Sequence, residues 1–245
     1  MNLQTHTTHR QLWIIGLIGM VLINGALWLS VRDVKSRWTN VPPVPSRISA
    51  AFSGLGDEQF AYRTIGLSVQ NLGDTGGRVT NLAEYNYETL GKWMMLEHSF
   101  DPVSNFMPTL AGFLFGASNK STDLKPIIDY MEIAGSVKAP QKWRWLAQAA
   151  FLAKHKMKDM NRALELANKL AAMDDPDMPI WTKQMPGFIL NQQGEKQAAL
   201  ALMIQLLKTE GEKLNPTEIN AIKGYICEQI FEPEEAKTHA LCQDL

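Results

Sequence analysis

The closest group of titratable side chains in this sequence is Glu97, His98 and Asp101. A carboxylate beside an imidazole can act as a general acid or base when a pocket holds a substrate against both groups. His98, however, is expected at the end of a helix, where the helix dipole favours a cationic side chain. We therefore interpret this group as structural.

The other reactive residue types show none of the common catalytic or metal-binding spacings. Beyond the N-terminal segment the histidines are His98, His155 and His239, far apart and without the His-Glu-x-x-His pair that places two ligands on one helical face. The chain also lacks a Cys-x-x-Cys motif and a Gly-x-Ser-x-Gly elbow. We expect no catalytic residue, no metal, no other cofactor and no small-molecule substrate; an enzyme whose site is assembled from distant residues is the alternative.

No segment predicts binding of a polyanion. The glycine-rich stretch Gly73 to Arg78 follows an expected helix rather than a strand and lacks the Gly-Lys-Ser/Thr ending of a phosphate loop, so a loop between helices is the better interpretation. A net charge of −1 without a Lys/Arg cluster gives no reason to expect nucleic acid. The one basic run, Lys154 to Lys158, falls where a helix should end, and solvated charge explains it.

The N-terminal segment from Leu12 to Val31 contains no charged residue. As a helix it would be roughly 30 Å long, the thickness of the hydrocarbon core of a bilayer. Trp13 and Trp28 lie near its ends, and Arg10 and Arg32 bracket it. A cleaved signal peptide would have a shorter apolar stretch and a small-x-small cleavage site. We expect an uncleaved transmembrane anchor, with a buried core helix as the alternative.

After the anchor, three prolines in Val41 to Ser46 (VPPVPS) predict an extended, semi-rigid spacer. The first soluble helix is expected from Asp57, its N-cap, to Asn71. The expected division is an N-terminal tail at 1–11, the anchor at 12–31, a proline-containing linker at 32–56 and a helical-repeat domain at 57–245.

The most informative regularity is a set of prolines spaced by 38, 39 and 37 residues: Pro102, Pro140, Pro179 and Pro216. Proline is tolerated in the first turn of a helix, so each one can mark the first helix of a repeated unit. A second helix-start signal follows in three units, at Thr122-Asp123, Lys158-Asp159 and Gly194-Glu195. Small residues that would let paired helices approach closely are Ala149, Ala150, Ala163, Ala167, Ala198 and Ala199.

This pattern resembles the tetratricopeptide repeat family, whose unit is an antiparallel helix pair. Trp145-Leu146 and Trp181 lie early in first helices, and Gly194 with Ala198-Ala199 is similar to the family's turn signal. The unit is a few residues longer than the usual 34. With its N-terminal anchor, the chain also resembles bacterial membrane-anchored proteins with tetratricopeptide-like domains. The resemblance implies an all-α fold, a transmembrane helix followed by stacked helix pairs.

Stacked helix pairs present their first helices on one extended surface, which repeat proteins use to hold protein partners. The expected function is therefore a membrane-tethered adaptor or scaffold, or a fixed subunit of a membrane or envelope complex. A membrane-surface enzyme is the alternative. The polar residues expected to contact a partner are Arg144, Gln148, Lys183 and Asn191, for which a plain solvent face is the competing interpretation.

Two observations bear on the side of the membrane, and they disagree. Arg32, Lys35 and Arg37 outnumber Arg10 across the anchor, so the positive-inside rule places the domain in the cytoplasm. Cys227 and Cys242 could instead form a disulfide, which needs an oxidising compartment, although two free thiols are equally open from the sequence. We expect a single-pass protein of the bacterial inner membrane with a periplasmic domain, and keep the cytoplasmic orientation open.

Overall fold

A computed structural model describes residues 3–32, 41–75 and 78–243. The chain divides into two compact units, Met1–Thr39 and Asn40–Leu245. The first unit contains the helix α1 (Leu3–Val31), in which Gln11–Ser30 is long and apolar enough to cross a membrane, with none of this segment buried. The expected anchor is therefore helical along its length. Lys35 and Arg37, used above for the orientation, lie outside the described residues.

The second unit begins with α2 (Arg47–Ser53) and α3 (Glu58–Gln70). Asp57 caps α3 as expected, because its carboxylate accepts from the backbone N–H of Gln59 and Phe60 at 2.9 and 3.0 Å. A two-residue antiparallel ladder, β1 (Asp74–Thr75) with β2 (Arg78–Val79), then forms the expected break. The other regular elements of the described unit are helices.

The sequence predicts one helix after this break, capped by Asn81 or Thr80 and running through Met94, and the structure splits it in two. Asn81 caps a short 3₁₀ helix, η1 (Leu82–Glu84), and Asn86 caps α4 (Tyr87–His98). Between them Tyr85 is extended and its hydroxyl donates to the carbonyl of Leu72. Each asparagine accepts hydrogen bonds from the free N–H groups of its own helix, so two helices begin within six residues.

The remaining elements follow in helix pairs. The first helices, with their irregular ends, are α5 (Phe106–Thr109) with the π turn η2 (Leu110–Leu114) and the 3₁₀ turn η3 (Phe115–Ala117), α7 (Trp143–Leu152) with η5 (Ala153–Met157), α9 (Trp181–Gln192), and α11 (Pro216–Tyr225) with η7 (Ile226–Ile230). The second helices and connections are η4 (Ser121–Asp123), α6 (Leu124–Gly135), α8 (Met160–Ala171), α10 (Lys196–Glu210), η6 (Gly211–Lys213), α12 (Pro233–Thr238) and η8 (Ala240–Cys242).

The recurring prolines mark the starts of the first helices. They precede or open α5, α7, α9 and α11, and Pro216 occupies the first turn of α11 behind a capping box formed by Asn215 and Glu218. Second helices begin at the expected signals too, since Asp159 caps α8 and Glu195 directly precedes α10. The repeated spacing therefore predicted the order of helices correctly.

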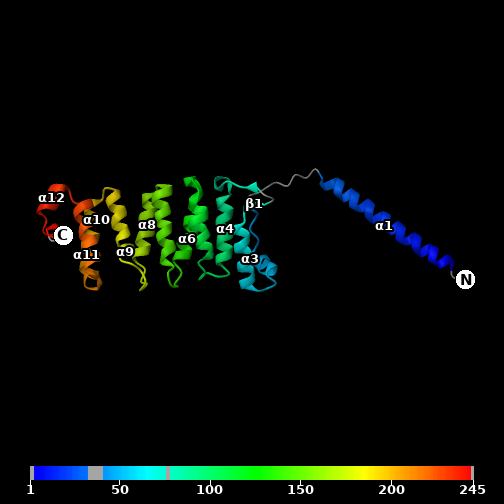
Figure 1. Ribbon diagram of the computed structural model, residues 1–245, viewed down its shortest axis with the longest axis horizontal. Helices are drawn as coiled ribbons and strands as arrows, with labels where there is room; N and C mark the ends of the chain where they lie inside the picture. Colours follow the sequence, from blue (N-terminus) through cyan, green and yellow to red (C-terminus); the bar gives the residue numbers. More distant parts are fainter. Residues whose placement is uncertain (1–2, 33–40, 76–77, 244–245) are drawn as a thin grey trace. The chain divides into compact units, whose positions relative to one another are not determined.

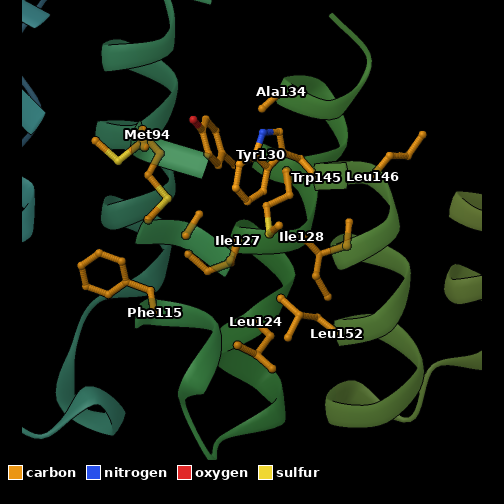
Figure 2. Packing of buried hydrophobic residues seen from close by; sticks show 14 of the residues in the cluster. Met94, Phe115, Leu124, Ile127, Ile128, Tyr130, Ala134, Trp145, Leu146 and Leu152 are labelled. Atoms are coloured by element: carbon orange, nitrogen blue, oxygen red, sulfur yellow. The ribbon is translucent and has the colours of Figure 1, made fainter. Parts of the chain in front are cut away.

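Successive helices from α6 to α10 pack against one another in chain order, with α4 against α6 (Figure 1). The main hydrophobic core runs from Val41 to Ile189, and a second cluster joins α10 to α11 and η7. Figure 2 shows the centre of the main core, where side chains of α4, α6 and α7 meet, among them Met94, Ile127 and Leu146. Close approach depends on small residues, because a Cβ at Gly135 of α6 would lie 2.5 Å from the backbone nitrogen of Leu146. Of the six alanines expected in the seams, only Ala198 is exposed.

Residues 41–56, expected in the linker, pack within the second unit. Val41 and Ala50 are buried in its core, and the indole of Trp93 donates to the carbonyl of Pro42 at 2.8 Å. Ser46 caps α2 through the backbone N–H of Ser49. The prolines thus hold an extended segment against α4, and the compact unit starts near Asn40 rather than at residue 57.

At the C-terminal end Cys227 and Cys242 are joined by a disulfide, with their Cα atoms 5.8 Å apart. The bond links η7 to η8 across α12. The ring of Phe231 contacts that of His239 inside the same hairpin, with centroids 4.7 Å apart. This terminal hairpin closes the second hydrophobic cluster.

Candidate functional site: an aromatic groove

A groove of about 680 Å³ lies across three consecutive first helices. We call it the aromatic groove and define it by its lining residues, Asn105, Phe113, Gln141, Trp143, Arg144, Trp145, Ala147, Gln148, Phe151, Trp181 and Met185. They come from the residue before α5 and from η2, from α7 and Gln141 just ahead of it, and from α9.

Helix α7 forms the largest part of the groove, because one of its faces packs into the core and another lines the groove. Leu146, Ala149 and Ala150 are buried in the core, as the period of an α-helix requires for a packed face. Arg144, Gln148 and Phe151, at i, i+4 and i+7, form a stripe on another face that lines the groove.

Aromatic rings from neighbouring helices meet edge to face along the groove. The rings of Phe113 and Trp145 lie 6.3 Å apart between centroids, and those of Trp143 and Trp181 lie 5.8 Å apart. Phe113, Phe151 and Trp181 are nevertheless 64, 48 and 40% exposed. Clustered exposed aromatic surface is uncommon on a soluble domain, which makes the groove the candidate functional site.

Polar groups around the rings are few and mostly engaged. The indole N–H of Trp145 donates to Oδ1 of Asn105 at 2.7 Å, which fixes the Trp145 ring against the residue that precedes α5. The guanidinium of Arg144 lies 5.5 Å from the centroid of the Trp143 ring, in cation–π contact. Arg144 is the one charged residue among the lining residues. The groove can therefore hold apolar groups and offers a positive charge to one anionic group.

The residue that leads into α7 adopts an unusual backbone conformation. Gln141 has φ of 64°, in the left-handed region that side chains with a Cβ seldom occupy, and its carbonyl accepts from the N–H of Arg144 at 3.2 Å. This turn leads directly into Trp143 and Arg144, which both line the groove.

The four residues expected to contact a partner are divided by the structure. Arg144 and Gln148 line the groove together. Lys183 pairs with Glu210 of α10 at 2.8 Å, and the Asn191 amide donates to the Tyr225 hydroxyl and to the backbone at Gln229. Lys183 and Asn191 thus join α9 to α10 and to α11 with η7.

Sequence reasoning missed the aromatic residues as a site. Trp143 and Trp181, which meet in the groove, are 38 residues apart, close to the proline spacing. Equivalent positions in consecutive stacked units lie side by side, so repeated tryptophans were the available signal. The second helices carry ion pairs instead, such as Arg162 of α8 with Asp129 and Glu132 of α6.

Of the group first considered for chemistry, Glu97 belongs to a buried polar cluster, which we call the Glu97 cluster: Tyr62, Glu97, Ser104, Tyr130 and Lys142. Lys142 is buried and its ammonium donates to the carbonyl of Ser104 at 2.6 Å, while the hydroxyls of Tyr62 and Ser104 are hydrogen-bonded. Oε1 of Glu97 and the hydroxyl of Tyr130 have no hydrogen-bond partner among the described residues.

Burial controls the protonation of the Glu97 cluster. It raises the pKa of Glu97 to about 8, helped by the negative charge of Asp101 and opposed by the Tyr62 hydrogen bond and by Lys142. Burial also lowers the pKa of Lys142 and of His98. Because Glu97 is only 1% exposed, its carboxyl group is closed to a substrate, in agreement with a structural role. Within the described ranges no group of three or more His, Cys, Asp or Glu side chains is placed to hold a metal.

Comparison of the chain with protein-family models, with curated proteins and with solved structures found no match.

Proposed function

We propose that this protein is a membrane-tethered scaffold whose aromatic groove binds a segment of a protein partner. In this proposal α1 spans the membrane, and the second unit is a tetratricopeptide-like stack of antiparallel helix pairs. The ordered packing of α6 to α10 and the length and hydropathy of α1 support these two parts. The exposed aromatic groove is the observation that carries the binding function.

The groove favours a partner of defined chemistry. Tryptophan and arginine are enriched among the residues that contribute most to protein interfaces, and phenylalanine is enriched in interfaces generally. A partner segment with two or three large apolar side chains would fill the space beside Trp181 and Phe113. A carboxylate on that segment would face Arg144, since no acidic residue lines the groove.

We place the domain on the periplasmic side of a bacterial inner membrane. The disulfide between Cys227 and Cys242 supports this choice, because such bonds persist in oxidising compartments. A catalytic function is the weaker proposal. The titratable groups with the most strongly shifted pKa values lie in the closed Glu97 cluster and not in the groove.

Site-specific cross-linking tests the groove directly. A photo-cross-linking amino acid replaces Phe113 in the full chain in native membranes, and in the control it replaces Ile133, an exposed apolar residue of α6 outside the groove. We expect a discrete protein adduct from position 113 that is lost on Arg144→Glu and absent from position 133. Equal adducts from both positions, or an adduct insensitive to Arg144→Glu, would refute the groove as the binding site.

The same preparation separates two kinds of scaffold. A fixed subunit of a complex should be recovered with its partner in constant ratio after mild detergent extraction. A transient adaptor should be recovered largely alone without cross-linking, although the adduct at position 113 forms in both cases.

A further inference from the structure

The beginning of the second unit exposes a set of large apolar side chains that the groove does not include. Ile48 and Phe52 lie four residues apart on α2, and Leu55 follows in the next turn; they are 73, 77 and 90% exposed. With Phe60, at the start of α3, we call them the apolar patch. The other side of α2 packs into the domain through Ala50. The helix is therefore apolar both toward the domain and toward its surroundings.

The exposure of Leu55 is imposed by its turn. Leu55 has φ of 55°, a left-handed conformation that costs a residue with a Cβ free energy. Hydrogen bonds from the N–H groups of Leu55 and Gly56 to the carbonyls of Phe52 and Ala51 hold the turn closed. Beneath it, a Cβ at Gly54 would lie 2.8 Å from that of Ala61, so the turn is fixed against α3. A leucine is thus held away from the domain in a strained conformation, an arrangement typical of functional positions.

We infer that the apolar patch inserts into the interface of the bilayer that holds α1. This inference rests on the membrane tether proposed above. Residues 32–46 separate the end of α1 from the start of α2, and even a fully extended chain of that length reaches only about 50 Å. The patch therefore stays within that distance of the end of α1, and a modest affinity for lipid suffices for it to bind the membrane.

The charges around the patch indicate which kind of membrane contact is formed. Arg47 precedes Ile48, but it pairs with Glu58 at 2.5 Å and stacks on the ring of Phe100. Its charge is therefore already balanced within the domain. Asp57, between Leu55 and Phe60, is exposed and acidic. The contact consequently depends on buried apolar area and not on attraction to anionic headgroups, and we expect neither low salt nor anionic lipid to strengthen it.

Lipid quenching of a fluorescent label tests the inference in the full chain reconstituted into liposomes. Leu22→Cys, in the middle of α1, Phe52→Cys, in the patch, and Phe113→Cys, in the groove, are labelled separately without reductant, so that the native disulfide stays closed. Phe52 and Phe113 are matched, since both are exposed phenylalanines. We expect brominated lipids to quench the labels at positions 22 and 52 several-fold more than the label at 113.

The outcomes separate the tether from the patch. Quenching at position 22 with position 52 equal to 113 would overturn the inference while leaving the tether intact, whereas no quenching at 22 would overturn the tether itself. Quenching at 52 that disappears on Leu55→Glu, but persists in high salt and in neutral lipid, supports the inference. Self-quenching at 52 that grows with protein density, without lipid quenching, would assign the patch to a second copy of the chain and overturn it.

Discussion

Replacing Glu97 by glutamine should remove a large pH dependence of stability. The carboxyl group is buried, its Oε1 has no partner among the described residues, and Tyr62, Tyr130, Lys142 and Asp101 surround it electrostatically. In the unfolded chain its pKa is close to 4.5, and in the folded protein it is about 8. The folded state thus keeps a proton that the unfolded state releases.

The sign and size of the effect follow from this difference. Stability from the retained proton is fully present below pH 4.5 and is lost as the pH rises toward 8, by about 1.4 kcal/mol per pH unit and about 5 kcal/mol at most. Lys142 acts in the opposite direction at higher pH, because burial lowers its pKa and the folded state releases that proton first. The unfolding midpoint of Glu97→Gln, which is neutral at every pH, should therefore not fall between pH 6 and pH 8.5, as that of the native chain does.

Urea unfolding of the full chain in mild detergent, followed by tryptophan fluorescence from pH 5 to 9, measures the difference. The matched control is Glu88→Gln, an exposed glutamate of the same helix, which should keep the pH dependence of the native sequence. If the native chain and Glu97→Gln give parallel curves across this range, the buried carboxyl group does not hold its proton and the argument is wrong.

Substitutions at three further positions test separate parts of the structure. Cys227→Ser should destabilise the terminal hairpin by up to ~3 kcal/mol, and reductant should lower the stability of the native chain equally; thiol labelling of Cys227 or Cys242 in untreated cells would contradict the disulfide. Leu55→Gly should raise the free energy of unfolding by about 1 kcal/mol, whereas Leu55→Ala should not, because alanine keeps the Cβ that makes a left-handed φ costly. Trp145→Phe should cost about 1 kcal/mol through the lost hydrogen bond to Asn105, and an unchanged unfolding midpoint would show that this bond contributes nothing.

Features encoded in a few adjacent residues were the ones that the sequence predicted well. Asp57 before α3 and Asp159 before α8 accept hydrogen bonds from N–H groups two or three residues on, and each proline fixes its own φ and lacks an N–H. These effects are local, so no knowledge of packing was needed. The split at Asn81 and Asn86 was missed because either asparagine alone could cap one long helix.

Features made by distant residues could not be derived in the same way. The contact of Trp93 with Pro42 joins residues 51 positions apart and turns an expected spacer into part of the domain. The aromatic groove likewise collects Phe113, Trp143 and Trp181 from three helix pairs. The composition does not distinguish these residues from the other aromatic residues. Only Trp143 and Trp181 are related in the sequence, through a spacing close to that of the prolines.

Residues of three helix pairs line the aromatic groove, so the groove stays intact only while all three pairs remain folded. In linear arrays, end units fray before central ones, and loss of α9 would remove Trp181 and Met185 and leave the groove without one side. A ligand that touches all three pairs would hold them together, so occupancy should slow opening of the array from its C-terminal end. On the proposed function, a chain that ends after α8 lacks Trp181 and Met185 and should no longer hold a partner that contacts all three helix pairs.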